Sequence, residues 1–258
     1  MQMNFEAIQS YWENRAAQDS SAQSTTQDVY LREIENRVLR GVCDHVKPRQ
    51  VLDVGCGDGL TTVRLSEQLP QIEFTGCDYS ESMLKNASRN IELASVKNVQ
   101  VCTADVTKTL PKGSFDLVYT TRCLINLPSW ELQEAALNRI SDSIRPNGFY
   151  AMIENFIEGQ NNFNELRVSF GLEPISVREH NTFFETAKLR KKMERRFDLM
   201  ENVNISSSYY LVSRIVYSKL CQLNKETPNY LDPHHEWGSR LPFAGEHGPV
   251  RMMLWRKR

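Results

Sequence analysis

The sequence lacks the features that mark several special classes of protein. Lys and Arg together number 31 and Asp and Glu 32, so the formal net charge is only −1. A chain this balanced has no chain-wide electrostatic surface for nucleic acid or membrane, although it can carry a local basic patch. No apolar run approaches the roughly 18–20 residues of a membrane-spanning helix. The first six residues have neither the basic start nor the apolar stretch of a secretory signal, so we expect a cytoplasmic protein.

The six cysteines show neither a disulfide framework nor a metal site. No two of them have C-x-x-C spacing, and a chain of 258 residues is long enough to form a core without disulfides. We therefore expect buried free thiols, which fit a reducing compartment. The five histidines do not combine with the cysteines at zinc-type spacing, so we predict no structural metal.

Two periodicities organise the first 155 residues. Residues 1–18 and about 27–46 have the pattern of helices, separated by a polar loop at 20–26. From residue 50, short apolar runs alternate with amphipathic segments. The expected strands are 51–54, 72–77, 99–102, 115–119 and 149–153, and the helices among them are 60–69, 80–93 and 129–144. This alternation predicts a parallel sheet with helices on its faces.

The alternation stops after residue 155. We expect an insertion there, with an irregular piece at 174–184 and a basic helix at 185–197. A strand at 198–205, a helix at 208–223, a turn-rich segment and a last strand at 250–255 then follow. In the basic helix, Leu189, Met193 and Phe197 recur at helical spacing, which is typical of an amphipathic helix with a solvated charged face. Nucleic acid is therefore not the expected partner.

A glycine-rich turn at 53–59, with the sequence DVGCGDG, follows the first predicted strand. The dinucleotide fingerprint G-x-G-x-x-G requires a glycine at position 60, which is Leu60. Asp53 would attract an ammonium group but repel a pyrophosphate. Asp78 ends the second strand, where a carboxylate can accept hydrogen bonds from ribose hydroxyls. The pattern thus indicates a nucleoside with an amino-acid tail and no phosphates, a description that S-adenosylmethionine matches.

Five segments of residues 51–154 resemble the core of class I S-adenosylmethionine-dependent methyltransferases in order and spacing. They are VLDVGCGDG at 51–59, GCDYSESML at 76–84, ADV at 104–106, FDLV at 115–118 and IRPNG at 144–148. The resemblance implies an α/β fold, with a three-layer Rossmann-like sheet of seven strands whose last strand is antiparallel. It also implies one methyltransferase domain over 1–258. Its parts would be an N-terminal helical lid (1–46), a cofactor-binding core (50–155), an acceptor-cap insertion (156–200) and closing strands and helix (201–258).

The same resemblance implies where the cofactor S-adenosylmethionine binds. Asp53 would help to place its amino group, Asp78 would bind the ribose and Asp105 the adenine amino group. Tyr11 and Arg15 belong to a segment similar to a lid helix, although Tyr11 suits plain core packing equally well. The full set of implied cofactor-binding residues is Tyr11, Arg15, Asp53, Gly55, Cys56, Gly57, Asp78, Tyr79, Met83, Ala104, Asp105 and Thr121.

The acceptor has to be inferred from the variable parts, because the cofactor methyl group is already activated and the family has no universal catalytic residue. The segment TTRCLINLP at 120–128 lacks the Asp/Asn-Pro-Pro-Tyr/Phe motif of adenine and glutamine methyltransferases. We expect Arg122 in this segment to hold an acceptor carboxylate or phosphate, or alternatively to form a salt bridge with a neighbouring loop.

The insertion supplies further acceptor candidates. Arg178 and His180 are expected to bind a polar or anionic acceptor, with His180 as the first candidate base because its ordinary pKa lies near neutrality. Glu154, at the end of the fifth strand, is the second candidate base, and a purely structural role is the alternative for His180. We therefore expect O-methylation of a polar small-molecule, sugar or glycan acceptor by in-line displacement. The alternatives are an RNA methyltransferase, a non-catalytic S-adenosylmethionine-binding protein and a NAD-type oxidoreductase.

Overall fold

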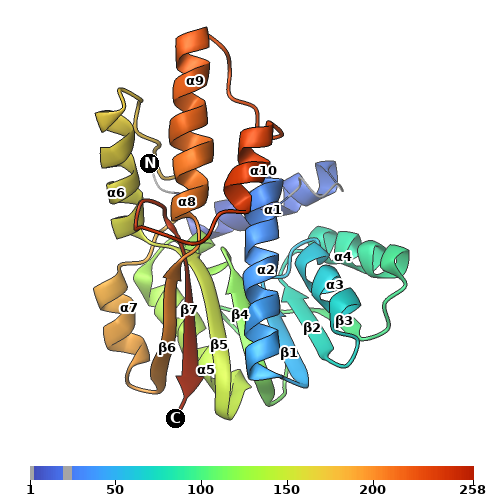
Figure 1. The fold of residues 1–258 in the computed structure, drawn as a ribbon. Coiled ribbons are helices and arrows are strands. Elements are labelled where there is room, and N and C mark those ends of the chain that lie inside the picture. Colours follow the sequence, from blue (N-terminus) through green and yellow to red (C-terminus); the bar gives the residue numbers. More distant parts are fainter. Residues whose placement is uncertain (1–2, 20–24) are drawn as a thin grey trace.

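The computed structural model describes residues 3–19 and 25–258, so most of the predicted loop at 20–26 and the first two residues of the predicted first helix lie outside the described residues. In this part of the chain, seven strands form one sheet in the order β3-β2-β1-β4-β5-β7-β6 (Figure 1). The strands are β1 (Gln50–Val54), β2 (Glu73–Asp78), β3 (Val99–Thr103), β4 (Phe115–Thr121), β5 (Ile144–Asn155), β6 (Phe197–Asn204) and β7 (Val250–Lys257). Strand β7 runs antiparallel to both of its neighbours, which confirms the predicted seven-stranded sheet with an antiparallel last strand.

The predicted helices form, with shifts at their ends. The helices are α1 (Phe5–Gln18), α2 (Val29–Val46), α3 (Leu60–Gln68), α4 (Glu81–Ala94), α5 (Trp130–Ser143), α6 (Ile157–Ser169), α7 (Thr186–Met193), α8 (Ser207–Tyr210), α9 (Tyr217–Asn224) and α10 (Pro233–Ser239). A π-helical segment, Leu211–Val216, joins α8 to α9. The basic helix α7 is shorter than predicted. Helix α10 was not predicted, although Asp232 and Pro233 provide an N-cap and a first-turn proline.

Successive residues of the central strands pack on opposite faces of the sheet. Val51 joins the apolar cluster that α2 and α3 form on one face, whereas Leu52 joins the cluster of α5 and α7 on the other. Both residues are fully buried. Strands covered on both faces are apolar along their whole length, which explains why the short apolar runs in the sequence located them correctly.

The elements outside this three-layer core gather at one end of the sheet. Figure 1 shows α1, α6, α9 and α10 at the end opposite the C-terminus, where the parallel strands terminate.

All six cysteines are free thiols, four of them buried. No helix within residues 3–19 and 25–258 combines the length and apolar character that crossing a membrane requires. Within the same residues, no three His, Cys, Asp or Glu side chains are grouped to hold a metal ion.

Candidate functional site

A cavity of about 420 Å³ lies where the parallel strands end. Val54, Asp78, Thr121 and Asn155, from the ends of β1, β2, β4 and β5, all line it. Parallel strands present their carboxyl ends at one edge of a sheet, and this edge is where open α/β sheets bind ligands. The sheet topology therefore brings together residues that lie up to 101 positions apart in the sequence.

The glycine-rich turn forms the floor of the cavity next to β1. Gly55 and Gly57 have φ values of 76° and 53°, which L side chains rarely adopt. A Cβ atom at Gly55 would also collide with Sγ of Cys123. The backbone N–H groups of Gly55 and Cys56 both donate to the carbonyl of Cys77, which ties the turn to β2. The turn is thus held in a shape that only glycine permits.

Asp78 links the glycine turn to the start of α4. One of its carboxylate oxygens accepts a hydrogen bond from the N–H of Gly57 at 2.9 Å, and the other accepts one from the N–H of Ser80 at 3.0 Å. Burial raises the pKa of Asp78, while these backbone donors oppose the rise. Each carboxylate oxygen can accept more than one hydrogen bond, so the group keeps capacity for a ligand.

Asp53 lies deeper, beneath the glycine turn, and is only 3% exposed. One of its oxygens accepts hydrogen bonds from Oγ1 of Thr62 at 2.5 Å and from Oη of Tyr119 at 2.8 Å. Burial raises the pKa of Asp53 to about 7, although the two hydroxyls favour its charged form. Its side-chain partners in the described part of the chain are hydroxyls, so this carboxylate has no cation beside it to balance its charge.

Helix α1 covers the cavity from the N-terminal side. Glu13 accepts a hydrogen bond from Oγ of Ser80 at 2.5 Å and further ones from the N–H and hydroxyl of Ser82, which fixes α1 to the start of α4. These hydrogen bonds lower the pKa of Glu13. Nε1 of Trp12 donates to Oδ1 of Asn126 at 3.2 Å, so α1 also contacts the segment after β4.

All the predicted cofactor residues except Tyr11 line the cavity. The ring of Tyr11 instead stacks on His180, with the ring centroids 4.9 Å apart, so Tyr11 contacts the insertion rather than the cavity. Among the residues that do line the cavity, Asp105 is bound within its own turn. Its Oδ1 accepts from the N–H and hydroxyl of Thr107, and its Oδ2 lies 3.3 Å from Nζ of Lys108.

Three buried or half-buried ion pairs form the wall next to α2. Arg32 pairs with Asp58 at 3.5 Å, Arg122 pairs with Glu35 through two contacts of 2.7 and 3.1 Å, and Arg214 pairs with Asp28 at 2.5 Å. Burial raises the pKa of Glu35, and the guanidinium of Arg122 opposes the rise. The sequence pattern did not identify Asp28, Arg32 and Glu35 as residues of the site, because each lies at least 26 positions from the residue with which it pairs.

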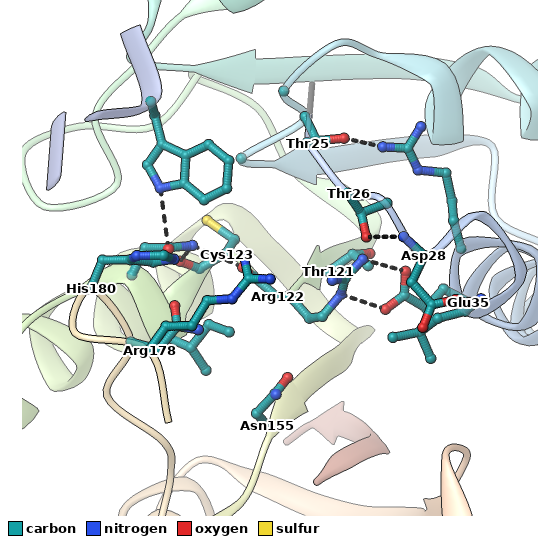
Figure 2. A pocket seen from close by; sticks show the side chains of 18 of the residues that line it. Thr25, Thr26, Asp28, Glu35, Thr121, Arg122, Cys123, Asn155, Arg178 and His180 are labelled. Carbon is teal, nitrogen blue, oxygen red and sulfur yellow. Dashed lines mark hydrogen bonds and ion pairs between the residues drawn. The ribbon is translucent and has the colours of Figure 1, made fainter. Parts of the chain in front are cut away.

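The surroundings of Arg122 bear on the two roles expected for it. Arg122 does line the cavity, but its guanidinium is bidentate to Glu35, so its charge is already compensated. Of the two roles expected for Arg122, this geometry matches the salt bridge, although the partner belongs to a helix rather than a loop. Figure 2 shows the two side chains facing each other.

Glu154 also has surroundings that differ from those expected of a base. It is fully buried, does not line the cavity, and accepts hydrogen bonds from the N–H groups of Cys123, Leu124 and Ile125 at 3.1, 2.9 and 3.3 Å. Burial raises the pKa of Glu154 to about 7. The side chain therefore holds the segment after β4 in place and does not face the cavity.

His180 lies in the segment between α6 and α7, as predicted, and lines the cavity. It is buried, stacked on Tyr11 and edge-on to Trp12. Burial lowers its pKa, and the positive charges of Arg178 and Arg15 lower it further. The imidazole is therefore neutral at neutral pH, the state in which it can accept a proton.

Arg214 stands on the far wall of the cavity within the π-helical segment. Its guanidinium carbon lies 4.8 Å from the ring centroids of both Tyr210 and Tyr230, and Nη1 of Arg214 donates to Oη of Tyr230 at 3.1 Å. Cation–π contacts on two sides hold the guanidinium against Asp28. No local sequence pattern indicated this cluster, since Arg214 and Asp28 are 186 residues apart.

Comparison with known sequences identifies the central part of the chain. Residues 51–148 match the family model of a methyltransferase domain. A trans-aconitate 2-methyltransferase of Acidovorax sp. (strain JS42) is 34% identical over 109 residues, which cover 42% of this chain and 39% of that relative. The chain thus matches about two fifths of the length of this relative. An uncharacterized protein of Rickettsia prowazekii is 25% identical over 206 residues, covering 75% of this chain and 80% of that protein.

Solved structures share the fold over nearly the whole chain. The N-methyltransferase NodS of Bradyrhizobium japonicum, in complex with S-adenosyl-L-homocysteine, has a TM-score of 0.61 at 12% identity and covers 97% of this chain and 98% of its own. The magnesium protoporphyrin IX methyltransferase of Synechocystis, also with S-adenosylhomocysteine bound, has a TM-score of 0.62 at 16% identity, with coverages of 98% and 99%. Residues 51–148 are therefore similar to a methyltransferase domain, and the chain as a whole shares the fold of these two methyltransferase structures.

Proposed function

We propose that the protein transfers a methyl group from S-adenosylmethionine to an oxygen of a polar small-molecule acceptor. One observation carries the proposal: Asp53, the glycine turn and Asp78 meet in a single cavity at the ends of adjacent parallel strands. This set offers a buried carboxylate for an ammonium group, backbone N–H groups in a tight turn, and a second carboxylate for ribose hydroxyls.

The residues present are suited to this cofactor. Asp53 lacks a cationic partner among the described residues, and the ammonium group of the methionine moiety would provide one. Oγ1 of Thr121 and Oη of Tyr79 are buried without hydrogen-bond partners inside the described chain, and both residues line the cavity. Thr121 would face the methionine part and Tyr79 the adenine part. Met83 would pack against the adenine, and Arg15 would close over the cofactor from α1.

When bound, the cofactor would supply an activated methyl group on a sulfonium sulfur. An acceptor oxygen held in line with the carbon–sulfur bond would form a bond to the methyl carbon as the bond to sulfur breaks. The task of the protein is therefore alignment, exclusion of water and proton removal. His180 would take the proton of an acceptor hydroxyl, because it is neutral and lines the same cavity. Glu13 and Trp12 hold α1 over the cavity and so keep water out.

The basic helix α7 gives little support to the RNA alternative. None of its residues lines the cavity, and Figure 1 places α7 beside β6, away from the helices that gather over the strand ends.

One related chain is named a malonyl-[acyl-carrier protein] O-methyltransferase, from Ilyobacter polytropus, 23% identical over 164 residues. This name is consistent with transfer to oxygen, whereas NodS is an N-methyltransferase.

Calorimetric titration of the full chain with S-adenosylhomocysteine and with NAD tests the cofactor part. We expect binding of the first and not of the second, and the reverse result would favour an oxidoreductase.

Methyl transfer from radiolabelled S-adenosylmethionine to the small-molecule fraction of a cell extract tests catalysis. His180→Asn should lose transfer while keeping cofactor affinity, whereas His45→Asn, at an exposed position on α2, should change neither. A fully active His180→Asn variant would exclude His180 as the base.

A further inference from the structure

We infer that the acceptor carries a carboxylate and that Arg178 binds it, with Asn155 binding a hydrogen-bond donor on the same molecule. This inference rests on the proposed methyl transfer and names the substrate class of the same cavity. It follows from the charges that line the cavity and from the polar atoms there that lack partners.

The cations of the cavity wall are not equivalent. Arg32, Arg122 and Arg214 each pair with a carboxylate of the chain, as described above. Arg178 also lines the cavity, but it makes no ion pair or side-chain hydrogen bond with the residues that the structure describes. Figure 2 shows its side chain extending from the wall that carries His180 toward Arg122. An exposed guanidinium in this position is available to an anion that enters the cavity.

Asn155 provides the second observation. It ends β5, is only 9% exposed, and lines the cavity. Its Oδ1 is buried and has no hydrogen-bond partner among residues 3–19 and 25–258. A buried amide oxygen without a donor costs about 1–3 kcal/mol. A ligand hydroxyl or amino group would satisfy this atom, so the acceptor is expected to carry such a donor as well as an anion.

The segment that carries Arg178 is held rigidly on both sides. Ile175 N–H donates to Oδ1 of Asn164 at 2.9 Å, and its carbonyl accepts from Nε2 of Gln160 at 2.7 Å and from Nδ2 of Asn164 at 3.1 Å. On the other side, Thr182 N–H donates to the carbonyl of Ile125 at 2.7 Å. These contacts with α6 and with the segment after β4 restrain the backbone that carries Arg178, so its ordering on binding is limited to the side chain.

A carboxylate suits this arrangement better than a phosphate. One guanidinium offers a planar pair of N–H donors, which matches the two oxygens of a carboxylate. Arg32, Arg122 and Arg214 are paired with Asp58, Glu35 and Asp28, so on this part of the wall a doubly charged phosphate would meet Arg178 close to several carboxylates. The positive charge of Arg178 lowers the pKa of His180, and both residues line the cavity. The neutral imidazole can then take the proton of a hydroxyl on the same acceptor. The expected class is a hydroxy-carboxylate.

The test uses the full chain saturated with S-adenosylhomocysteine and matched pairs of probes. The pairs are lactate and lactamide, hydroxybenzoate and hydroxybenzamide, and glucuronate and glucuronamide, with phenyl phosphate as the phosphate probe. Calorimetry should show at least one acid binding about tenfold or more tightly than its amide, which is the scale of a hydrogen bond to a charged group. Arg178→Gln should abolish this preference and Arg178→Lys should keep part of it. Arg195→Gln, which removes an exposed arginine beyond α7, should leave it unchanged.

Three outcomes would overturn the inference. They are the absence of any preference for an acid over its amide, a preference that survives in Arg178→Gln, and tighter binding of phenyl phosphate than of every acid. The affinity for S-adenosylhomocysteine is measured first in each variant. If the wild-type chain does not bind S-adenosylhomocysteine, the proposed function is refuted. If it binds S-adenosylhomocysteine but shows no preference for an acid over its amide, only this inference is refuted.

Discussion

Arg122 and Glu35 form a bidentate ion pair, with Nε of Arg122 2.7 Å from Oε1 of Glu35 and Nη2 3.1 Å from Oε2. Glu35 is 1% exposed, and the side chain of Arg122 is 24% exposed. Arg122 has a φ of 48°, in the left-handed region that non-glycine residues rarely adopt. The pair therefore ties α2 to a strained point just after β4, directly at the cavity.

Glu35→Gln should destabilise the protein strongly, because it leaves the guanidinium of Arg122 without a counter-charge. We expect a loss of about 3 kcal/mol in the free energy of unfolding, the lower end for broken buried pairs, since Arg122 is not fully buried. Denaturant unfolding measures this loss. Glu236→Gln removes the same group from a surface pair with Arg240 and should cost less than about 1 kcal/mol. Equal costs for the two variants would show that burial does not strengthen the Arg122–Glu35 pair.

Cofactor affinity should depend on pH through Asp53. Its pKa is about 7 in the free protein because the group is buried, so below that pH it is protonated and cannot balance an ammonium group. Affinity for S-adenosylhomocysteine should therefore rise with pH up to about 7 and level off above it, since binding the cation releases the proton. Titrations between about pH 5.5 and 7.5 measure this rise. In Asp53→Asn the affinity should be lower and nearly independent of pH over this range, and an unchanged pH profile would assign the dependence to another group.

Glu13 should control cofactor affinity without contacting the cofactor, because it fixes α1 to the first turn of α4. Glu13→Ala removes these hydrogen bonds, and we expect affinity for S-adenosylhomocysteine to fall about three- to tenfold, the scale of one or two hydrogen bonds. Hydrogen exchange in α1 should increase at the same time. Asn14→Ala, at an exposed neighbouring position, is the matched control. Faster exchange in α1 with unchanged affinity would mean that the position of α1 does not matter for binding.

Local sequence patterns predicted the parts of the molecule that depend on local rules. The apolar runs located β1 and β2, and the glycine spacing with Asp53 and Asp78 selected residues that line the cavity. The acceptor side depends on contacts between distant residues, such as Arg122 with Glu35, 87 positions away. A residue pattern carries no information about the identity of such a partner, so a salt bridge of Arg122 could be expected as one alternative, but Glu35 could not be named. Helix α10 was missed because the surrounding prolines indicated only turns.

The position of Glu154 shows a second limit of the sequence pattern. A carboxylate at the end of β5 was expected to face the acceptor, since the ends of parallel strands line the ligand site. Successive strand residues point to alternate sides, however, and here Asn155 lines the cavity while Glu154 accepts from the backbone of 123–125. Locating the end of a strand without its exact register therefore does not tell which of two neighbouring residues lines the cavity.

The most direct test of the account is the affinity of Asp78→Ala for S-adenosylhomocysteine, measured by calorimetry beside the wild type and Asp44→Ala. Asp44 is exposed on α2, so its removal should leave affinity unchanged. We predict that Asp78→Ala weakens binding by about 1–3 kcal/mol, because it removes a carboxylate that accepts from the glycine turn and, in the proposed site, would accept from the ribose hydroxyls. A folded Asp78→Ala variant that binds as tightly as the wild type would contradict the assignment of this cavity to S-adenosylmethionine.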